Sequence, residues 1–383
     1  MLIFHGMLRS ENFGDTLMAE IVVGWLRELT DSPIRTMFAD PRLRRRLGLE
    51  PAGPFDLLTA RAAVLSGGGY FQIADSGLPP LKRFVKNAGP ILLAQTVGVP
   101  SALLGIGVGR MPSRVLEAGV RRLFTKSEVA CVRDHIGFEA ARRVAPSANV
   151  VETADLVFTL HPDRLPQSAH VAADRLAPRR GERRQTAVLL SNTPDRDARY
   201  RSVVDALEDA AVAQPDRHVM LIEDHVTAGS GQQRIQALLH ERLGPDRSSI
   251  VPYPGSWKLA ALLARMDSVL TDKLHVALVA AALGAEPYSI AKHPKNLAAF
   301  ASLDLENNVT MLSERSTPRY GELATRAFQA SAPFAIADDV RRKAWLNRDN
   351  LSAFLTACGL APLSASSRRN DNDPQHSRLA HGR

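Results

Sequence analysis

The stretch LTDKLHVALVAAALGAEPYSIAKHPK, residues 270–295, indicates the fold class of this chain. It opens on a short apolar run, continues as an Ala-, Leu- and Val-rich segment of helical length, and returns through Pro287 to a second apolar run. A strand, a helix and a strand in this order form a right-handed crossover, which makes the two strands parallel. His275 lies on the first turn of the helix, and Lys295 lies among basic residues after the second strand. The unit predicts an α/β fold with cationic groups at one edge of a sheet.

The same alternation of apolar runs and amphipathic helical patterns extends on both sides of this unit. Strands are predicted at residues 1–6, 34–40, 62–69, 100–109, 128–134 and 149–160, and again at 186–192, 218–224, 248–254, 268–272 and 286–292. Two mostly parallel sheets that face each other across a cleft follow from this order.

The alternation is interrupted once, which divides the chain into domains. Its 383 residues, 45% of them hydrophobic, are enough for two cores of ordinary size. We predict a Rossmann-like domain at 1–160, a polar linker at 161–185 with room for one short helix, and a second Rossmann-like domain at 186–315. Only helical patterns follow, so 316–362 is predicted to pack on the sheets or cross between the domains. The last residues, 363–383, have almost no apolar content and are expected to be disordered.

The composition narrows the classes of partner without choosing one. A net charge of +8 suits phosphorylated substrates, an anionic membrane surface or nucleic acid. The two cysteines lie far apart and match no metal-ligand spacing, so no metal site is expected. The apolar runs are too short for a signal peptide or a membrane span, and we expect a cytoplasmic protein.

Ligands of open parallel sheets bind beyond the carboxyl ends of the strands. The loop NFGDT follows the first predicted strand and contains Asn12 and Asp15. Asp15 occupies an expected N-cap position, and the Asn12 amide is a candidate to orient a ligand hydroxyl. A capped turn with no ligand explains the same residues about equally well.

A second loop, SGGGYFQ, carries three consecutive glycines, Gly67, Gly68 and Gly69. Without side chains, they let the backbone approach a ligand closely and let successive N–H groups form an anion-binding concavity. The spacing is neither that of a Walker loop nor that of a dinucleotide fingerprint. A flexible turn is the alternative.

Two further strand ends carry cationic side chains. Arg133, in CVRDHIG, precedes a predicted helix and is suited to clasp a phosphate or carboxylate, although a surface pair with Asp134 is the alternative. His275, in TDKLHVA, lies at a helix start, where the helix dipole lowers the pKa of an imidazole and attracts anions. Lys273 and Lys295 flank it at the same predicted edge; a purely structural histidine is the alternative.

Taken together, these motifs resemble those of the polysaccharide pyruvyl transferase family. The resemblance rests on NFGD (12–15), GGGYF (67–71), VRDHIGFEAAR (132–142), ADLVFTL (154–160) and LHVALVAAALGAEPYSIAKHPK (274–295), in that order.

The resemblance implies two Rossmann-like domains similar to GT-B glycosyltransferases, with the acceptor on the N-terminal side and the donor on the C-terminal side. It implies transfer of the enolpyruvyl group of phosphoenolpyruvate to a sugar of an exopolysaccharide or lipid-linked oligosaccharide, commonly as a pyruvate ketal, with no further cofactor. Carried over by position, Arg133 and His275 contact phosphoenolpyruvate, with Leu274 and Lys295 beside them. Asp15 lines the cleft together with the three glycines.

Ketal formation needs a general acid for the methylene carbon of the donor and a base for the sugar hydroxyl. We assign His275 to the acid or phosphate-stabilising role, Arg133 to neutralising the leaving phosphate, and Asp15 or Asp155 to the base. The family commonly has an arginine in the dipeptide before the histidine. Here Lys273 supplies a charge without the planar fork of arginine.

Two other interpretations remain open at this point. A GT-B glycosyltransferase that uses a nucleotide sugar has the same fold, and the carboxylates of EDH at 223–225 are candidates for a ribose contact. A catalytically silent binding protein of an export complex retains the architecture with altered chemistry. Nucleic acid is not expected as a partner, because the basic residues lack interleaved aromatics.

The basic segment PRLRRRLG at 41–48 is a candidate for peripheral contact with the inner membrane at its cytoplasmic face. A solvated helix face is the alternative for this segment.

Overall fold

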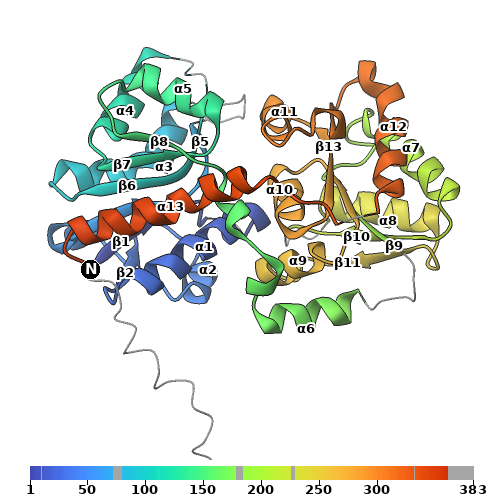
Figure 1. Ribbon diagram of the computed structural model, residues 1–383, viewed down its shortest axis with the longest axis horizontal. Helices are drawn as coiled ribbons and strands as arrows, with labels where there is room; N and C mark the ends of the chain where they lie inside the picture. Colours follow the sequence, from blue (N-terminus) through green and yellow to red (C-terminus); the bar gives the residue numbers. More distant parts are fainter. Residues whose placement is uncertain are drawn as a thin grey trace, which may run out of the picture.

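The computed structural model describes residues 1–9, 11–71, 80–109, 111, 113–177, 184–225, 229–331 and 333–360. These residues form two α/β domains that lie side by side (Figure 1). The predicted disordered tail, 363–383, lies outside the described residues.

Over the described ranges the first sheet has eight strands in the order β3-β2-β1-β4-β6-β7-β8, with β5 paired to β6, and every pairing is parallel. The strands are β1 (Leu2–His5), β2 (Ile34–Thr36), β3 (Glu50–Pro51), β4 (Ala62–Leu65), β5 (Gly68–Phe71), β6 (Ser101–Val108), β7 (Val129–Val132) and β8 (Val150–Glu152). Strands β1, β4, β6 and β7 are buried along their whole length because helices cover both faces of the sheet.

The helices of the first domain divide between these two faces. One face packs on α1 (Phe13–Leu29) and α2 (Pro41–Arg46). The other packs on the 3-10 helix η1 (Pro54–Thr59), α3 (Pro80–Thr96), α4 (Arg114–Thr125) and α5 (His135–Val144).

The second sheet has, within the described residues, six parallel strands in the order β11-β10-β9-β12-β13-β14. They are β9 (Arg184–Leu189), β10 (Arg217–Ile222), β11 (Ser248–Val251), β12 (Ser268–Thr271), β13 (Glu286–Ala291) and β14 (Val309–Met311). One face is covered by α7 (Tyr200–Ala213), α8 (Gly231–Leu243) and α12 (Thr317–Gln329), the other by α6 (Gln167–Leu176), α9 (Ser256–Leu263) and α10 (Leu274–Leu283). Helix α11 (Pro294–Ala301) contacts β13, β14 and the 3-10 helix η4 (Glu306–Asn308), whereas the 3-10 helix η5 (Glu314–Ser316) contacts α12.

Two segments differ from the sequence prediction. Of the strand expected at 149–160, only β8 forms, and residues Leu156–Thr159 make a 3-10 helix, η2. The cause is local, because the Asp155 carboxylate accepts a hydrogen bond from the Val157 N–H (3.2 Å) and turns the chain away from the sheet. The expected linker at 161–185 holds η3 (Pro162–Arg164) and α6, which packs on α9 of the second domain; residues 178–183 lie outside the described residues.

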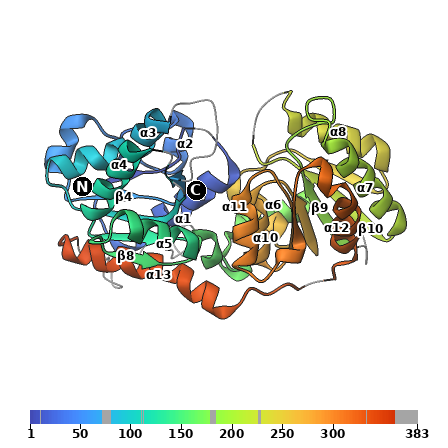
Figure 2. The same ribbon diagram turned by 90° about the horizontal axis from the view of Figure 1, so that it is seen from above.

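The last helix, α13 (Asp338–Ala357), leaves the second domain and packs back on the first, as Figures 1 and 2 show. It contacts β6, β7, α1 and η2. Asn347 is fully buried at this contact, where its Oδ1 accepts the Gly105 N–H (2.8 Å) and its Nδ2 donates to the Ala154 carbonyl (3.1 Å). Gly105 has a positive φ of 59° at an irregular point of β6, so its N–H turns out of the ladder toward α13.

A shared apolar core joins the domains. Met18 of α1, Leu156 of η2 and Leu274 of α10 belong to one buried cluster that continues into α9. Glu20 of α1 adds a polar contact, since it accepts a hydrogen bond from Ser256 of α9 and pairs with Arg46 (3.3 Å). The domains therefore meet over packed side chains on the face where α1 and α10 lie.

No helix among the described residues combines the length and the apolar content needed to cross a bilayer. In the basic segment at 41–48, Arg46 pairs with Glu11 and Glu20, whereas Arg42 and Arg45 are exposed. Contact of this segment with lipid stays a prediction.

The Asn347 contacts predict a large effect of a single substitution on α13. Asn347→Leu should lower the stability by about 2 to 4 kcal/mol, because the buried Gly105 N–H and Ala154 carbonyl lose their partner. The thermal midpoint, followed by circular dichroism, measures this. Asn350→Leu is the matched control, since the Asn350 side chain bonds, within the described residues, only to Leu346 of its own helix, and the stability of this variant should stay within about 0.5 kcal/mol of the wild type. Equal midpoints for the two variants would show that α13 is not anchored by Asn347.

Candidate active site

Residues that follow three strands converge where the carboxyl edges of the two sheets meet. Arg133 directly follows β7, Asp155 lies three residues after β8, and His275 is the second residue of α10, after β12. Carboxyl ends of parallel strands are the usual ligand edge of such sheets. The two domains thus contribute to one cluster.

One carboxylate holds the cluster together. Asp155 Oδ2 accepts a hydrogen bond from Arg133 Nη1 (3.0 Å) and lies 3.8 Å from His275 Nε2. Arg133 Nη1 also lies 3.3 Å from the same His275 nitrogen. Arg133 and Asp155 are both buried, which is typical of an ion pair held in a fixed geometry.

The contact between Arg133 and His275 decides how the imidazole is protonated. A guanidinium only donates hydrogen bonds, so Nε2 of His275 acts as the acceptor and the ring proton is on Nδ1. Burial lowers the pKa of His275 to about 4; Asp155 opposes this shift, while Arg133 and Lys295 add to it. At neutral pH the imidazole of the free protein is uncharged.

The beginning of α1 approaches His275 very closely. A Cβ atom added to Gly14 would lie 2.4 Å from both Cβ and Nδ1 of His275, so only glycine fits there. The prediction that Asp15 caps this helix is wrong, because α1 begins two residues earlier. Asn12 is the N-cap, and its Oδ1 accepts the Gly14 N–H (3.1 Å). The amide oxygen expected to orient a ligand hydroxyl is therefore used in the cap, and contact with substrate stays a prediction.

Asp15, in the first turn of α1, is a carboxylate with a perturbed pKa. Burial raises the pKa of Asp15 to about 6, even though Lys295 and Arg133 oppose the rise. Asp155 and Asp224 contribute to the rise. Within the described residues Asp15 makes neither a hydrogen bond nor an ion pair through its side chain. Such a group is available for proton transfer near neutral pH.

The lysines complete the cationic side of the site. Burial of its ammonium lowers the pKa of Lys295 on α11, and Arg133 adds to the effect. Lys273 precedes α10 and pairs with Asp224 (3.6 Å) of the loop after β10. Leu274 is buried in the shared core, so it fixes the beginning of α10, where His275 lies.

The loop after β10 also joins the two domains. The Asp224 carbonyl accepts the Phe13 N–H (3.1 Å), and His225 pairs with Asn12 in an isolated antiparallel bridge. Burial opposes ionisation of Asp224, but the hydrogen bond with His225 and the charge of Lys273 outweigh it and lower the pKa of Asp224. This loop therefore places Lys273 relative to the beginning of α1.

The three glycines are not in the open loop that the sequence suggested. Gly68 and Gly69 lie in β5, which pairs with β6, and Gly67 is packed so tightly that a Cβ there would lie 2.7 Å from Leu156. Leu156 is adjacent to Asp155, so the glycines permit close packing beside the cluster. Binding of substrate by their N–H groups stays a prediction.

The sequence interpretation missed a second polar network in the C-terminal domain. Asp272, after β12, accepts hydrogen bonds from Ser191 N (2.9 Å), Ser191 Oγ (2.6 Å) and Tyr200, and lies 3.4 Å from Lys292. The sequence contained the information needed to predict this network. Ser191 follows β9 and Asp272 follows β12, and these two strands are adjacent in the centre of the sheet. No cluster of side chains suited to hold a metal ion occurs among the described residues.

Solved structures with the same fold include UDP-GlcNAc 2-epimerases. The enzyme from Neisseria meningitidis bound to UDP-GlcNAc has a TM-score of 0.58 at 10% identity, over 93% of this chain and 99% of that one. The enzyme from Methanocaldococcus jannaschii gives 0.58 at 11% identity over the same shares, and a putative one from Listeria monocytogenes 0.54 at 12% over 93% and 95%. These likenesses confirm the predicted pair of Rossmann-like domains similar to GT-B.

No protein of curated function matches the chain. The sequence family described as Polysaccharide pyruvyl transferase matches residues 12–294, a span that runs from the N-cap of α1 to the first residue of α11 and contains Arg133, Asp155 and His275. The chain therefore belongs to the polysaccharide pyruvyl transferase family.

Proposed function

We propose that this protein transfers the enolpyruvyl group of phosphoenolpyruvate to a sugar of an exopolysaccharide or lipid-linked oligosaccharide and forms a pyruvate ketal. The observation that carries the proposal is the Arg133, Asp155 and His275 cluster across the domain boundary, inside the span that matches the family. The surrounding groups are those that a donor with a phosphate and a carboxylate requires.

The site gathers cationic side chains from both domains beside the N-terminus of a helix. Lys295 and Lys273 lie beside Arg133 and His275, and they influence one another electrostatically. In addition, α10 has no side-chain cap at its N-terminus within the described residues, so the N–H groups of its first turn are available to an anion. The phosphate is placed at this helix start, against Arg133.

The reaction requires no oxidant or reductant. A proton adds to the methylene carbon of the donor, a sugar hydroxyl attacks the adjacent carbon and loses its proton to a base, and the bond to phosphate breaks. A second hydroxyl of the same sugar then closes the ketal ring. Arg133 neutralises the leaving phosphate, and interactions of this kind contribute most where water is excluded.

His275 and Asp15 supply the proton transfers in this proposal. The neutral His275 of the free protein gains basicity when a phosphate dianion lies beside it, because a nearby negative charge favours the imidazolium. It then protonates the methylene carbon or stabilises the phosphate. Asp15, with its pKa raised to about 6, is ionised above that pH and accepts the hydroxyl proton.

Binding of the donor can be tested apart from turnover. At a hundredfold excess over its dissociation constant, phosphoenolpyruvate should stabilise the wild type by about 2.7 kcal/mol, and the thermal midpoint should show it. His275→Ala should lose most of this gain, whereas His161→Ala, an exposed histidine on η3, should retain it. UDP-GlcNAc is the competing probe, because the structural neighbour from Neisseria meningitidis is described with it bound. A response to UDP-GlcNAc with none to phosphoenolpyruvate would favour glycosyl transfer.

The close contact at Gly14 gives a test that removes no functional group. Gly14→Ala should displace His275 and lower the rate of pyruvyl transfer by about 10²-fold or more. Gly24→Ala, on the same helix with no atom within 4 Å of the new Cβ, should leave the rate unchanged and stabilise α1 by about 0.5 to 1 kcal/mol. Equal rates in both variants, measured by phosphate release, would contradict the position assigned to His275.

Asp15→Asn separates stability from activity. Because the folded-state pKa of about 6 exceeds the ordinary 3.8, the native state binds more protons between these values, and ionised Asp15 destabilises it above pH 6. The variant should therefore be more stable at pH 7.5 by about 1 to 3 kcal/mol, with no gain at pH 4. Its rate should fall by about 10² to 10⁴-fold, and the rise of wild-type kcat/KM through pH 6 should disappear. Full activity at pH 7.5 would remove Asp15 from the base role.

A further inference from the structure

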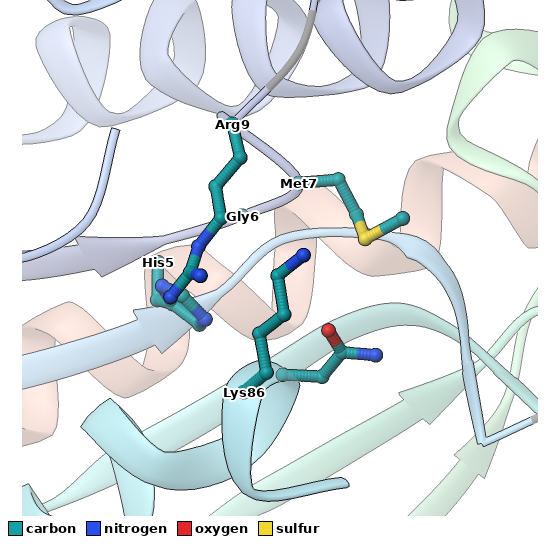
Figure 3. Close-up of a pocket in the computed structure, with 6 residues that line it drawn as sticks. His5, Gly6, Met7, Arg9 and Lys86 are labelled. Carbon is teal, nitrogen blue, oxygen red and sulfur yellow. The ribbon is translucent and has the colours of Figure 1, made fainter. Parts of the chain in front are cut away.

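A pocket opens at the carboxyl end of β1, apart from the cluster around Arg133. It is lined by His5, Gly6, Met7, Arg9, Lys86 and Asn87 and has about 70 Å³ of space open to the centres of water molecules (Figure 3). A single water needs about 10 to 15 Å³ in this measure, so the pocket holds a group the size of a phosphate or carboxylate. In Figure 3 the side chains of Arg9 and Lys86 extend toward it from opposite sides.

His5 makes this pocket more than a surface depression. Its side chain is buried to all but 3%, yet its Nδ1 has no hydrogen-bond partner in the described part of the chain. Buried polar atoms are nearly always paired, and an exception indicates a missing partner. Burial lowers the pKa of His5 to about 4, and Arg9 adds to this shift, while hydrogen bonds with the backbone of Asn87 and Lys86 oppose it.

The remaining polar groups of the pocket are cationic or neutral. Arg9 and Lys86 have no carboxylate partner among the described residues, and no acidic side chain lines the pocket. The Arg9 guanidinium lies 5.2 Å from the centre of the Phe38 ring, which holds this charge in place. Asn87 is largely buried beside them and adds an amide. Two cations without a carboxylate partner among the described residues, together with one amide, favour an anionic ligand.

The pocket lies on the same edge of the N-terminal sheet as Arg133, at a distance that one extended acceptor can span. β1 and β7 are separated by β4 and β6 in the sheet, so three inter-strand steps of about 4.8 Å put the pocket roughly 14 Å from the strand end that carries Arg133. This exceeds the length of one phosphoenolpyruvate molecule. Both strand ends lie on the same edge of the N-terminal sheet, so one extended glycan can reach both.

We propose that this pocket binds an anionic group, a phosphate or a carboxylate, of the acceptor glycan. The inference rests on the proposed function for the identity of the acceptor, and on the pocket itself for the charge of the group. A lipid-linked oligosaccharide supplies a phosphate through its lipid linkage, and an acidic polysaccharide supplies a sugar carboxylate. The pocket thereby selects acceptors that carry charge at a distance from the reacting hydroxyls.

The test uses the full chain with ¹⁵N-labelled histidines, titrated separately with inorganic pyrophosphate and with glucuronate. His5→Gln and His275→Gln assign the two ring signals. We expect a saturable shift of the His5 signal, with an affinity about tenfold or more weaker in Arg9→Met and in Lys86→Met, because each removes a charge-assisted contact. Lys82→Met, an exposed lysine one turn earlier on α3, is the matched control and should bind like the wild type.

The outcomes distinguish the sources and the two proposals. A response to pyrophosphate supports a phosphate on the acceptor, and a response to glucuronate supports an acidic sugar. The proposed anion pocket is wrong if neither anion shifts the His5 signal. It is also wrong if Arg9→Met and Lys82→Met bind the anion with equal affinity. A phosphoenolpyruvate titration run in parallel reports on His275. If His5 responds and His275 does not, the proposed function fails while the anion pocket stands.

Discussion

The carboxylate of Asp155 is the group on which the site depends. A buried guanidinium is stable only beside a partner, and Asp155 provides it for Arg133 while lying within 4 Å of His275. Its position comes from η2, whose first turn it caps. η2 in turn packs between α10, α1 and α13. Secondary structure from three distant parts of the chain therefore orients one ion pair, and through it the ring of His275.

Burial shifts the pKa values of the titratable groups around Arg133. The pKa values of His275 and Lys295 are lowered and that of Asp15 is raised, and burial is the main cause of each shift. Every one of these groups is biased toward its neutral form. A bound phosphate would reverse the bias on the cations by supplying the missing negative charge. Such arrangements cost stability in the free protein and are typical of functional sites.

The path of the chain explains how two domains hold such a site. The polypeptide passes from the first sheet to α6 of the second domain, builds the second sheet, and returns through α13 to pack on β6 and β7. The anchor of this return is Asn347, which hydrogen-bonds to the backbone of Gly105 within β6 and of Ala154 just after β8. The chain thus passes twice between the domains, and Leu156 and Leu274 pack in one core between them. Together these features favour a defined distance between Arg133 and His275.

The sequence by itself determined the fold class and the order of the strands along the chain, because buried parallel strands appear as apolar runs. It also determined the strand ends at which Arg133, His275 and Lys295 lie, because the carboxyl ends of such strands fall at predictable loops. It also indicated the family through the order and spacing of short motifs, and the family match over residues 12–294 confirms this. It did not predict which of several local hydrogen bonds forms. Asn12 rather than Asp15 caps α1, the Asp155 side chain turns the chain away from the sheet, and Gly68 and Gly69 lie in β5. Only the tertiary structure decided that Asp155 joins Arg133 to His275, that Gly14 must be small, and that His5 faces a cationic pocket. These are contacts between residues up to 261 positions apart (Gly14 and His275), and they depend on how two sheets pack, which no local pattern of residues encodes.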